Sequence, residues 1–365
     1  MKSLYRYELK KLICRPLGII VLSCTLALSV LAAVANGQQA LPVAAHWEGY
    51  QSGPSLSQAA WDTLSAQGDF LLNQRAISQP LTRPEKEMLA RYEGAAAARM
   101  PAGTQPIIQP AAEEKSLLEQ AARLEKHPIK AGYTGSAGWL FSALSLGLLI
   151  PALCMPFFLG GLFAEDARCG MDALQFSARF GRRRLLFCKL LSALTVWIPV
   201  TVVCALLAIL PPVLADPHTD WDASIQLLFP QAAYTLTLGQ TAGILLSAGV
   251  LLSLSSALFS MLLSSCCKTP LLGAVGGCIL VLFPLLRYLP SLSEAEALSR
   301  ALCWNLTSLL FGKDGNWDWL TIFDGVTLGG RFFSQMPLLL FLGGCFSAAL
   351  LLGNSCHFLT RQVRD

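Results

Sequence analysis

Charged residues are scarce in this chain of 365 residues: Asp, Glu, Lys and Arg make up 14% of it, whereas 54% of the residues are hydrophobic. Soluble globular domains carry about 25% charged residues, so this composition excludes an ordinary water-soluble protein. The mean hydropathy of +0.52 points the same way. The sequence therefore predicts a polytopic membrane protein.

Six runs are apolar over about the 20 residues that a helix needs to cross a bilayer core. We expect transmembrane helices at residues 16–35, 136–163, 185–214, 236–264, 270–288 and 333–357. The first run follows basic residues, as a signal peptide would, but it is long and Val34-Ala35-Asn36-Gly37 is a weak cleavage site. The expected fold is all-α with six transmembrane helices.

Ionisable side chains are missing from the middle of these runs. Glu165, Asp166 and Lys189 fall at the ends of spans, and Arg287 and His357 fall near span termini. Ion-driven carriers bury carboxylates, histidines or lysines at mid-membrane because those groups carry the coupling ion. The sequence therefore argues against an ion-driven transporter and against an intramembrane hydrolase.

The sequence also lacks residues spaced for metal binding or catalysis. Of the 12 cysteines only Cys303 falls in an outer segment, so the outer face has no internal disulfide framework. Cys266-Cys267 lacks the spacing of a zinc site and is interpreted as small apolar filler. We expect no catalytic, cofactor or metal site in this chain, and no nucleic-acid partner.

Lys and Arg are unevenly distributed, and positive charges mark the cytoplasmic segments of membrane proteins. With the amino terminus inside, the cytoplasmic segments hold 14 of the 27 basic residues and carry a net charge of about +9, against about −5 outside. The outer loop 215–233 contains Asp216, Asp220 and Asp222 but no Lys or Arg. Both termini are therefore expected in the cytoplasm.

Two outer segments follow from this topology. Residues 37–135 are expected to contain two amphipathic helices, at 83–100 and 111–126, with a solvated loop as the alternative. Residues 289–332 are rich in aromatic side chains and are expected to form interfacial helices at the headgroup level. An aromatic cluster that faces a substrate is the alternative for this second segment.

Small residues recur within the fifth span as Gly273-x-x-x-Gly277. Such spacing lets helix backbones approach closely, either within the chain or between two copies of it. Ahead of the first span, residues 1–15 are expected to form a cytoplasmic amphipathic helix, and a basic segment that only sets orientation would explain the charges equally well. The helix sets apolar side chains beside a basic stripe: Tyr5, Leu9 and Leu12 against Lys2, Arg6 and Lys10.

The cytoplasmic segment 164–184 is the most distinctive part of the chain. Its polar residues recur at helical spacing and form one stripe, made of Arg168, Asp172, Gln175, Arg179 and Arg182. Apolar residues form an adjacent stripe, made of Met171, Leu174, Ala178 and Leu185. A basic loop that only sets topology would explain the arginines but not the helical stripe. The pattern therefore predicts a short amphipathic helix against the inner face.

These residues resemble the integral membrane subunit of type-2 ABC exporters, which has six spans. The resemblance rests on an acidic residue after the second span, a glycine, a hydrophobic residue, a hydroxyl, a glycine-arginine turn and a lysine in the third span: Glu165, Gly170, Leu174, Ser177, Gly181, Arg182 and Lys189. The basic amino terminus and the interfacial segment support it. The long outer segment after the first span departs from the compact members.

The resemblance implies a permease that pairs with a second permease subunit and docks a separate ATP-binding subunit. This chain has no Gly-x-x-x-x-Gly-Lys-Ser/Thr loop, so ATP and magnesium are expected on the partner. The segment 164–184 would be the coupling helix. The residues expected to contact the ATP-binding subunit or to anchor the helix are Glu165, Arg168, Gly170, Met171, Asp172, Leu174, Phe176, Arg179, Gly181, Arg182 and Lys189.

The expected cargo is a peptide, a lipid or another amphipathic molecule, exported across a cell membrane, most simply a bacterial plasma membrane. The alternative function is a membrane sensor or scaffold, in which the outer segment binds a ligand and nothing is transported. A neighbouring chain with a phosphate loop would favour transport, and a neighbouring kinase or regulator would favour sensing.

Overall fold

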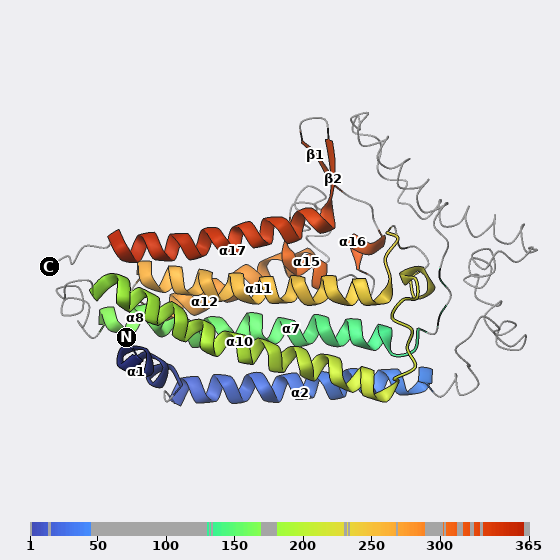
Figure 1. Cartoon of the computed structure of the whole chain (residues 1–365), viewed down its shortest axis with the longest axis horizontal. Helices are drawn as coiled ribbons and strands as arrows, with labels where there is room; N and C mark the ends of the chain where they lie inside the picture. The colour runs from blue at the N-terminus through green and yellow to red at the C-terminus, as the bar shows by residue number, and fades with distance from the viewer. Residues whose placement is uncertain are drawn as a thin grey trace, which may run out of the picture.

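The computed structural model describes residues 2–13, 16–44, 130, 132, 134–168, 181–229, 232, 234–267, 269–288, 302, 304–311, 317–321, 325–328 and 331–360. The long helices run side by side along one axis (Figure 1). They are α2 (Pro16–Ala44), α7 (Ala137–Leu159), α10 (Gly181–Ala215), α11 (Leu238–Cys267), α12 (Pro270–Leu282) and α17 (Gln335–Thr360). The shorter helices α1 (Lys2–Ile13) and α8 (Gly161–Arg168) lie at one end of the bundle (Figure 1). The helices expected at 83–100 and 111–126 lie outside the described residues.

Five of the described helical stretches are long and apolar enough to cross a membrane: Ala137–Asp166, Arg183–Ala215, Leu238–Cys267, Pro270–Arg287 and Gln335–Thr360. A sixth would come from Ser3–Ile13 and Gly18–Ala32 together, which meet at a bend of 64°. The prediction of a mostly helical protein is thus confirmed, with several helices long and apolar enough to cross a membrane.

Helix α7 occupies the centre of the bundle, packed against α2, α10, α11 and α12. Phe141, Leu144, Leu148 and Met155 on α7 are each at most 1% exposed. The outer helices α10 and α17 keep most of their apolar surface exposed. Within an 18-residue apolar stretch of each helix, only 28% and 22% of the residues are buried. A helix that is apolar on all sides is stable in a protein core or against lipid. The first environment fits the central helix α7, and the second fits the outer helices α10 and α17.

Several helix ends differ from the expected boundaries. The loop expected to extend to residue 184 ends earlier, because α10 begins at Gly181 and its arginines occupy the first helical turn. The fifth span turns into a 3₁₀ helix, η3 (Phe283–Tyr288), at Pro284, since proline lacks the N–H that an α-helix requires. The last span begins at Gln335 instead of residue 333.

A small antiparallel hairpin precedes α17, formed by β1 (Gly325–Leu328) and β2 (Arg331–Ser334). Gly325 pairs with Ser334, and Leu328 pairs with Arg331 at the turn. The hairpin stands away from the helices at one end of the molecule (Figure 1). The hairpin is a local addition, which the sequence analysis did not expect, to the mostly helical fold of the described residues.

The end of the bundle near the hairpin carries a cap of buried aromatic side chains. Two short helices belong to it, α15 (Leu306–Leu310) and α16 (Asp318–Thr321), together with the 3₁₀ turn η2 (Ile225–Leu227). We call the following residues the aromatic cap: Phe141, Phe229, Tyr234, Trp317 and Trp319. Trp317 meets Phe141 and Phe229 edge to face, with ring centroids 6.0 and 5.4 Å apart.

Helix α15 explains why the cap forms. Asn305 caps its start, because the side-chain oxygen accepts a hydrogen bond from the Thr307 N–H at 3.1 Å. At its end, the indole N–H groups of Trp317 and Trp319 donate to the carbonyls of Leu310 and Leu309, at 2.8 and 3.0 Å. These carbonyls would otherwise lack a partner, as the last four of any helix do.

The expected contact of aromatic residues in segment 289–332 with lipid headgroups is not made by two of them, because they are buried in the protein. Trp317 and Trp319 are 6% and 1% exposed, and they are buried inside the protein. Composition alone could not separate the two environments, since an indole with one polar N–H suits a membrane interface and a capped helix end equally well.

Candidate functional site: a buried charge cluster at the basic end

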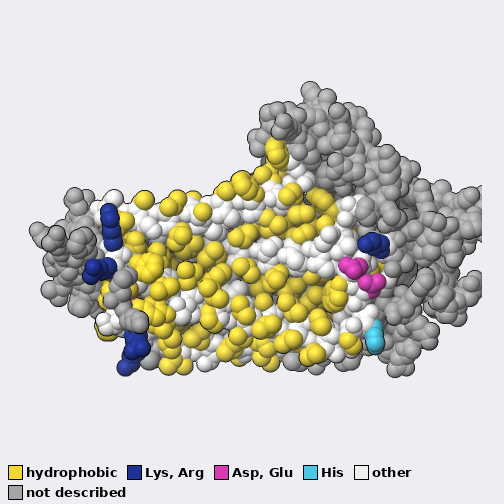
Figure 2. Space-filling model, in the orientation of Figure 1, with side chains coloured by type: hydrophobic (Ala, Val, Ile, Leu, Met, Phe, Trp, Pro, Cys, Tyr) yellow, Lys and Arg dark blue, Asp and Glu magenta, His cyan; other side chains and the backbone are white. Residues whose placement is uncertain are grey.

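The two ends of the bundle differ in charge. Lys and Arg gather at the end where α1, α8 and the start of α10 lie, and we call it the basic end; the described residues there include Arg6, Lys10, Lys11, Arg183 and Arg184 (Figure 2). The opposite end carries Asp216, Asp220 and Asp222 on the segment after α10, and we call it the acidic end. A wide apolar belt separates the two ends (Figure 2).

A cluster of charged side chains is buried at the basic end. The carboxylate of Asp166 in α8 accepts hydrogen bonds from two ammonium groups. Its Oδ1 atom accepts from Lys11 in α1, and its Oδ2 atom accepts from Lys189 in α10. Lys189 also donates to the carbonyl of Leu162 at 2.7 Å. Its ammonium lies 5.1 Å from the centre of the Phe163 ring, within the range of a cation–π contact.

Burial makes this cluster energetically important. Lys189 is 1% exposed and Asp166 is 3% exposed, whereas the side chain of Lys11 remains 22% exposed. A buried ion loses its hydration, which costs several kcal/mol unless a partner of opposite charge and further hydrogen bonds replace it. Lys189 and Asp166 therefore each supply the opposite charge that the burial of the other requires.

The local geometry of α8 brings its contacts to one face. Asp166 follows Leu162 by four residues and Phe163 by three, so it lies on the same side of the helix as both, toward Lys189. Glu165 is rotated from Asp166 by about 100° and is half-buried. The side of α8 that meets α10 therefore presents one carboxylate and one ring to the lysine.

A close helix crossing places α8 where the cluster needs it. A Cβ atom on Gly160, the residue between α7 and α8, would lie 2.9 Å from the Ser260 hydroxyl in α11 and 3.1 Å from the Ala274 nitrogen in α12. Such separations are too short for a side chain, so glycine permits the approach of α11 and α12 to this junction.

Helix α1 is attached to the same place by three contacts. Besides the Lys11–Asp166 pair, the hydroxyl of Tyr5 is hydrogen-bonded to that of Thr195 in α10 at 2.9 Å. Leu12, next to Lys11, is 1% exposed and joins a cluster of apolar side chains that includes Phe163 and Leu185. Glu8, one turn before Lys11, is also 1% exposed. The amphipathic α1 thus turns its buried side toward α8 and α10.

The cluster frames the segment that the sequence analysis singled out. Asp166 lies two residues before the end of α8 at Arg168, and Lys189 lies about 12 Å along α10 from its start at Gly181, where Arg182 follows. The remaining members of the expected coupling set lie outside the described residues: Gly170, Met171, Asp172, Leu174, Phe176 and Arg179. The ends of that segment are therefore joined through one ion pair.

The structure adds two residues that the sequence analysis did not include in the site, Asp166 and Lys11. A signal for the first was available: Lys189 interrupts an apolar helix and requires a counter-charge, and Asp166 shares its helical face with Leu162 and Phe163. Lys11 could not have been found in this way, because its contact with Asp166 spans 155 residues of sequence.

Gly273 and Gly277 face neighbouring helices of the same chain. A Cβ atom on Gly273 would lie 2.7 Å from the carbonyl oxygen of Ser260 in α11, and one on Gly277 would lie 2.7 Å from the ring of Pro156 in α7. Both glycines therefore permit the close crossing of α12 over α11 and α7.

Among the residues that the structure describes, the charge cluster makes ion pairs and hydrogen bonds. It contains no hydroxyl or thiol nucleophile beside a base, and no group of three His, Cys, Asp or Glu side chains suited to a metal ion occurs among the residues that the structure describes. The cluster holds three segments of the chain together through one carboxylate at the edge of the apolar belt.

Comparison with models of known protein families, with curated proteins and with solved structures gives no match for this chain. The fold and the site therefore define its class by themselves. It is a helical protein whose apolar helices are long enough to cross a membrane, with a buried charge cluster at its basic end.

Proposed function

We propose that this chain is the membrane-spanning permease subunit of a type-2 ABC exporter, with its basic end in the cytoplasm. A separate ATP-binding subunit docks on the segment between α8 and α10, and a second permease subunit completes the transport path. The sequence supports this through the pattern from Glu165 to Lys189 and through the absence of a phosphate loop in this chain.

The observation that carries the proposal is the charge cluster. A coupling element must pass the movement of the ATPase to the membrane helices as a unit, and a flexible attachment would dissipate it. Asp166 fastens α8 to α10 through Lys189 and to α1 through Lys11. A force applied between Arg168 and Gly181 therefore reaches three segments together.

The apolar residues of this segment give the docking surface its affinity, and the basic residues give it orientation. Met171, Leu174 and Phe176 seat the segment in a cleft of the ATPase, while Arg179 and Arg182 pair with acidic groups on that partner. ATP-driven closure of the ATPase pair then moves α8 and α10 together, and this movement rocks the second and third membrane spans. The cargo is an amphipathic molecule such as a peptide or a lipid, because charged groups are scarce in the helices.

The test is ATP hydrolysis by the complex of this chain with the phosphate-loop subunit encoded beside it. Leu174→Glu places a charge in the apolar docking face, and we expect the hydrolysis stimulated by the permease to fall at least tenfold. Leu214→Glu is the matched control: it introduces the same side chain at the acidic end of α10, where Leu214 is 75% exposed. We expect this control to retain stimulation.

Two results would overturn the proposal. Unchanged hydrolysis and export in a correctly inserted Leu174→Glu chain would remove the coupling role of the segment. Failure of any phosphate-loop subunit to copurify with the wild-type chain, together with capture of a kinase or regulator, would favour the sensor or scaffold function.

A further inference from the structure

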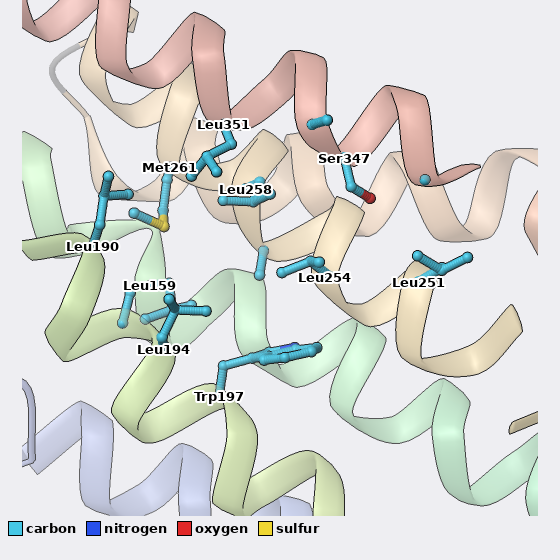
Figure 3. Close-up of a pocket in the computed structure, with 14 residues that line it drawn as sticks. Leu159, Leu190, Leu194, Trp197, Leu251, Leu254, Leu258, Met261, Ser347 and Leu351 are labelled. Carbon is cyan, nitrogen blue, oxygen red and sulfur yellow. The ribbon is translucent and has the colours of Figure 1, made fainter. Parts of the chain in front are cut away.

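An apolar cavity opens on the side of the bundle between α10 and α17. Its volume is about 280 Å³, and α11 forms its floor. Side chains from α10 and α17 converge on it from opposite walls, among them Leu190, Leu194 and Trp197 from one and Ser347 and Leu351 from the other (Figure 3). An apolar cavity of about 150 Å³ already binds benzene, so this one is large enough for an alkyl segment.

The cavity offers no polar group to a ligand. The indole N–H of Trp197 donates to the Ser253 hydroxyl at 3.0 Å. The hydroxyl of Ser347 is hydrogen-bonded to the Gly343 carbonyl at 2.9 Å and to the Ser255 hydroxyl at 2.8 Å. The other lining side chains are almost all aliphatic. The part of a ligand that enters must therefore be hydrocarbon, since a polar group would lose its hydration without compensation.

The mouth of the cavity faces outward from the bundle. Leu194 and Leu351 at its rim are 40% and 41% exposed, whereas Leu159 and Met261 within it are each 1% or less exposed. Both rim residues belong to helices long enough to cross a membrane. A hydrocarbon chain in the surrounding bilayer can therefore enter sideways.

The first turn of α10 places a positive charge above this mouth. Leu190, Leu194 and Trp197 follow Arg183 by 7, 11 and 14 residues, and at about 100° per residue all three lie within about 40° of it around the helix. Arg183 is exposed, and it lies about 10 Å along the helix from Leu190. An anionic group bound there would lie directly over a chain in the cavity.

We propose that this cavity binds one acyl chain of an anionic phospholipid, with Arg183 at the phosphate of the headgroup. The positive charge lies above the apolar cavity, just as the headgroup of a phospholipid lies above its acyl chain. This arrangement distinguishes the site from the exposed apolar surface elsewhere on the bundle. The binding requires only that α10 and α17 lie in a bilayer, so it stands apart from the proposed transport function.

The direct test uses the full chain in vesicles of phosphatidylcholine and phosphatidylglycerol, with a trace of phosphatidylglycerol that carries a diazirine on one acyl chain. After illumination, mass spectrometry locates the labelled peptides. We expect labelling of 190–197, 254–261 and 344–351 to exceed that of the exposed face of α12, which includes Leu271 and Ile279, at least fivefold. The same probe built on phosphatidylcholine should label these peptides about fivefold less, which corresponds to one basic residue near an anionic lipid.

Two variants with matched controls separate the chain from the headgroup. Gly344→Phe fills the cavity, and we expect labelling of 190–197 to fall at least fivefold. Gly243→Phe is the matched control at another helical glycine with open space around a Cβ atom, and it should leave labelling unchanged. Arg183→Gln should remove most of the preference for phosphatidylglycerol. Lys10→Gln on α1, on the far side of α10 from α17, should keep that preference (Figure 1).

Three results would overturn the proposal, and the first two come from the wild-type chain, so they do not depend on how well a variant folds. Labelling spread evenly over α10, α12 and α17 would mean ordinary contact with bulk lipid. Crosslinks between two copies across residues 190–197 would assign the cavity to a second chain. Equal labelling by both lipids in wild type and Arg183→Gln would remove the headgroup contact.

Discussion

The two ends of the bundle are both held by contacts between distant segments, but by different forces. At the basic end one carboxylate, Asp166, joins α1, α8 and α10 through two lysines. At the acidic end the aromatic cap and hydrogen bonds to the backbone join the segment after α10 to the start of α7 and to α15. The first arrangement is directional and concentrated in three side chains, and the second is spread over many.

This difference has a mechanical consequence. A concentrated ion pair keeps its geometry until it breaks, so the segments that it joins move together. A layer of interlocked rings and helix caps resists movement in every direction, because close-packed interiors tolerate few displacements. We therefore expect the basic end to receive movement from a partner and the acidic end to act as a fixed base.

The largest expected effect comes from removing the shared carboxylate. Asp166→Ala leaves the buried Lys189 without a counter-charge, and we expect a loss of about 3–5 kcal/mol in the free energy of unfolding. The measurement is unfolding in detergent micelles, followed by circular dichroism. Asp222→Asn, at an exposed carboxylate of the acidic end, is the control and should change stability by no more than about 0.5 kcal/mol.

A double variant distinguishes an unpaired charge from lost packing. Asp166→Leu with Lys189→Met replaces the pair by apolar side chains of similar size, and we expect stability within about 1 kcal/mol of wild type, since buried pairs often contribute little net stability. Lys11 can then turn to solvent, as its side chain is already 22% exposed. A loss as large as that of Asp166→Ala would refute the charge argument.

An intermediate effect is expected at the aromatic cap. Trp319→Phe keeps a ring in the core but removes the N–H that serves the Leu309 carbonyl, so we expect a loss of about 1–3 kcal/mol. Trp304→Phe is a matched control at a partly buried indole of the same segment. The measurement is the same unfolding titration, and equal losses for the two variants would contradict the capping role of Trp319.

The smallest expected effect concerns the link between the acidic end and residue 130. The Ser224 hydroxyl accepts a hydrogen bond from the Lys130 N–H at 2.8 Å, and the Ser224 N–H donates to the Lys130 carbonyl at 3.1 Å. Ser224→Ala removes only the first bond and should cost about 0.5–1.5 kcal/mol. Hydrogen exchange at the Lys130 amide should rise, and unchanged exchange would contradict the assignment.

The helices were predictable from the sequence because membrane spans depend on local composition. Runs of apolar residues located α7, α10, α11, α12 and α17 to within a few residues. Proline marked the change from α12 to η3, since its effect on the backbone is also local. The hairpin of β1 and β2 carries no comparable pattern in four-residue strands, and it was missed.

The site was predictable only in part. Lys189 was identified from its place in a motif, but the bound carboxylate is that of Asp166, and choosing between Glu165 and Asp166 requires the helical phase of α8 relative to α10. The contact of Lys11 with Asp166 requires the position of α1 in space. Composition placed Trp317 and Trp319 at a membrane surface, and only the fold shows that they cap α15.

The central claim is that another chain docks at the basic end, between α8 and α10. The most direct measurement places a photo-crosslinking amino acid at position 174 in the native membrane and, separately, at position 222 of the acidic end. We predict a crosslink from position 174 to a subunit that carries a phosphate loop, and none from position 222. Crosslinks to that subunit from position 222 alone, or from neither position in a complex that hydrolyses ATP, would contradict the account.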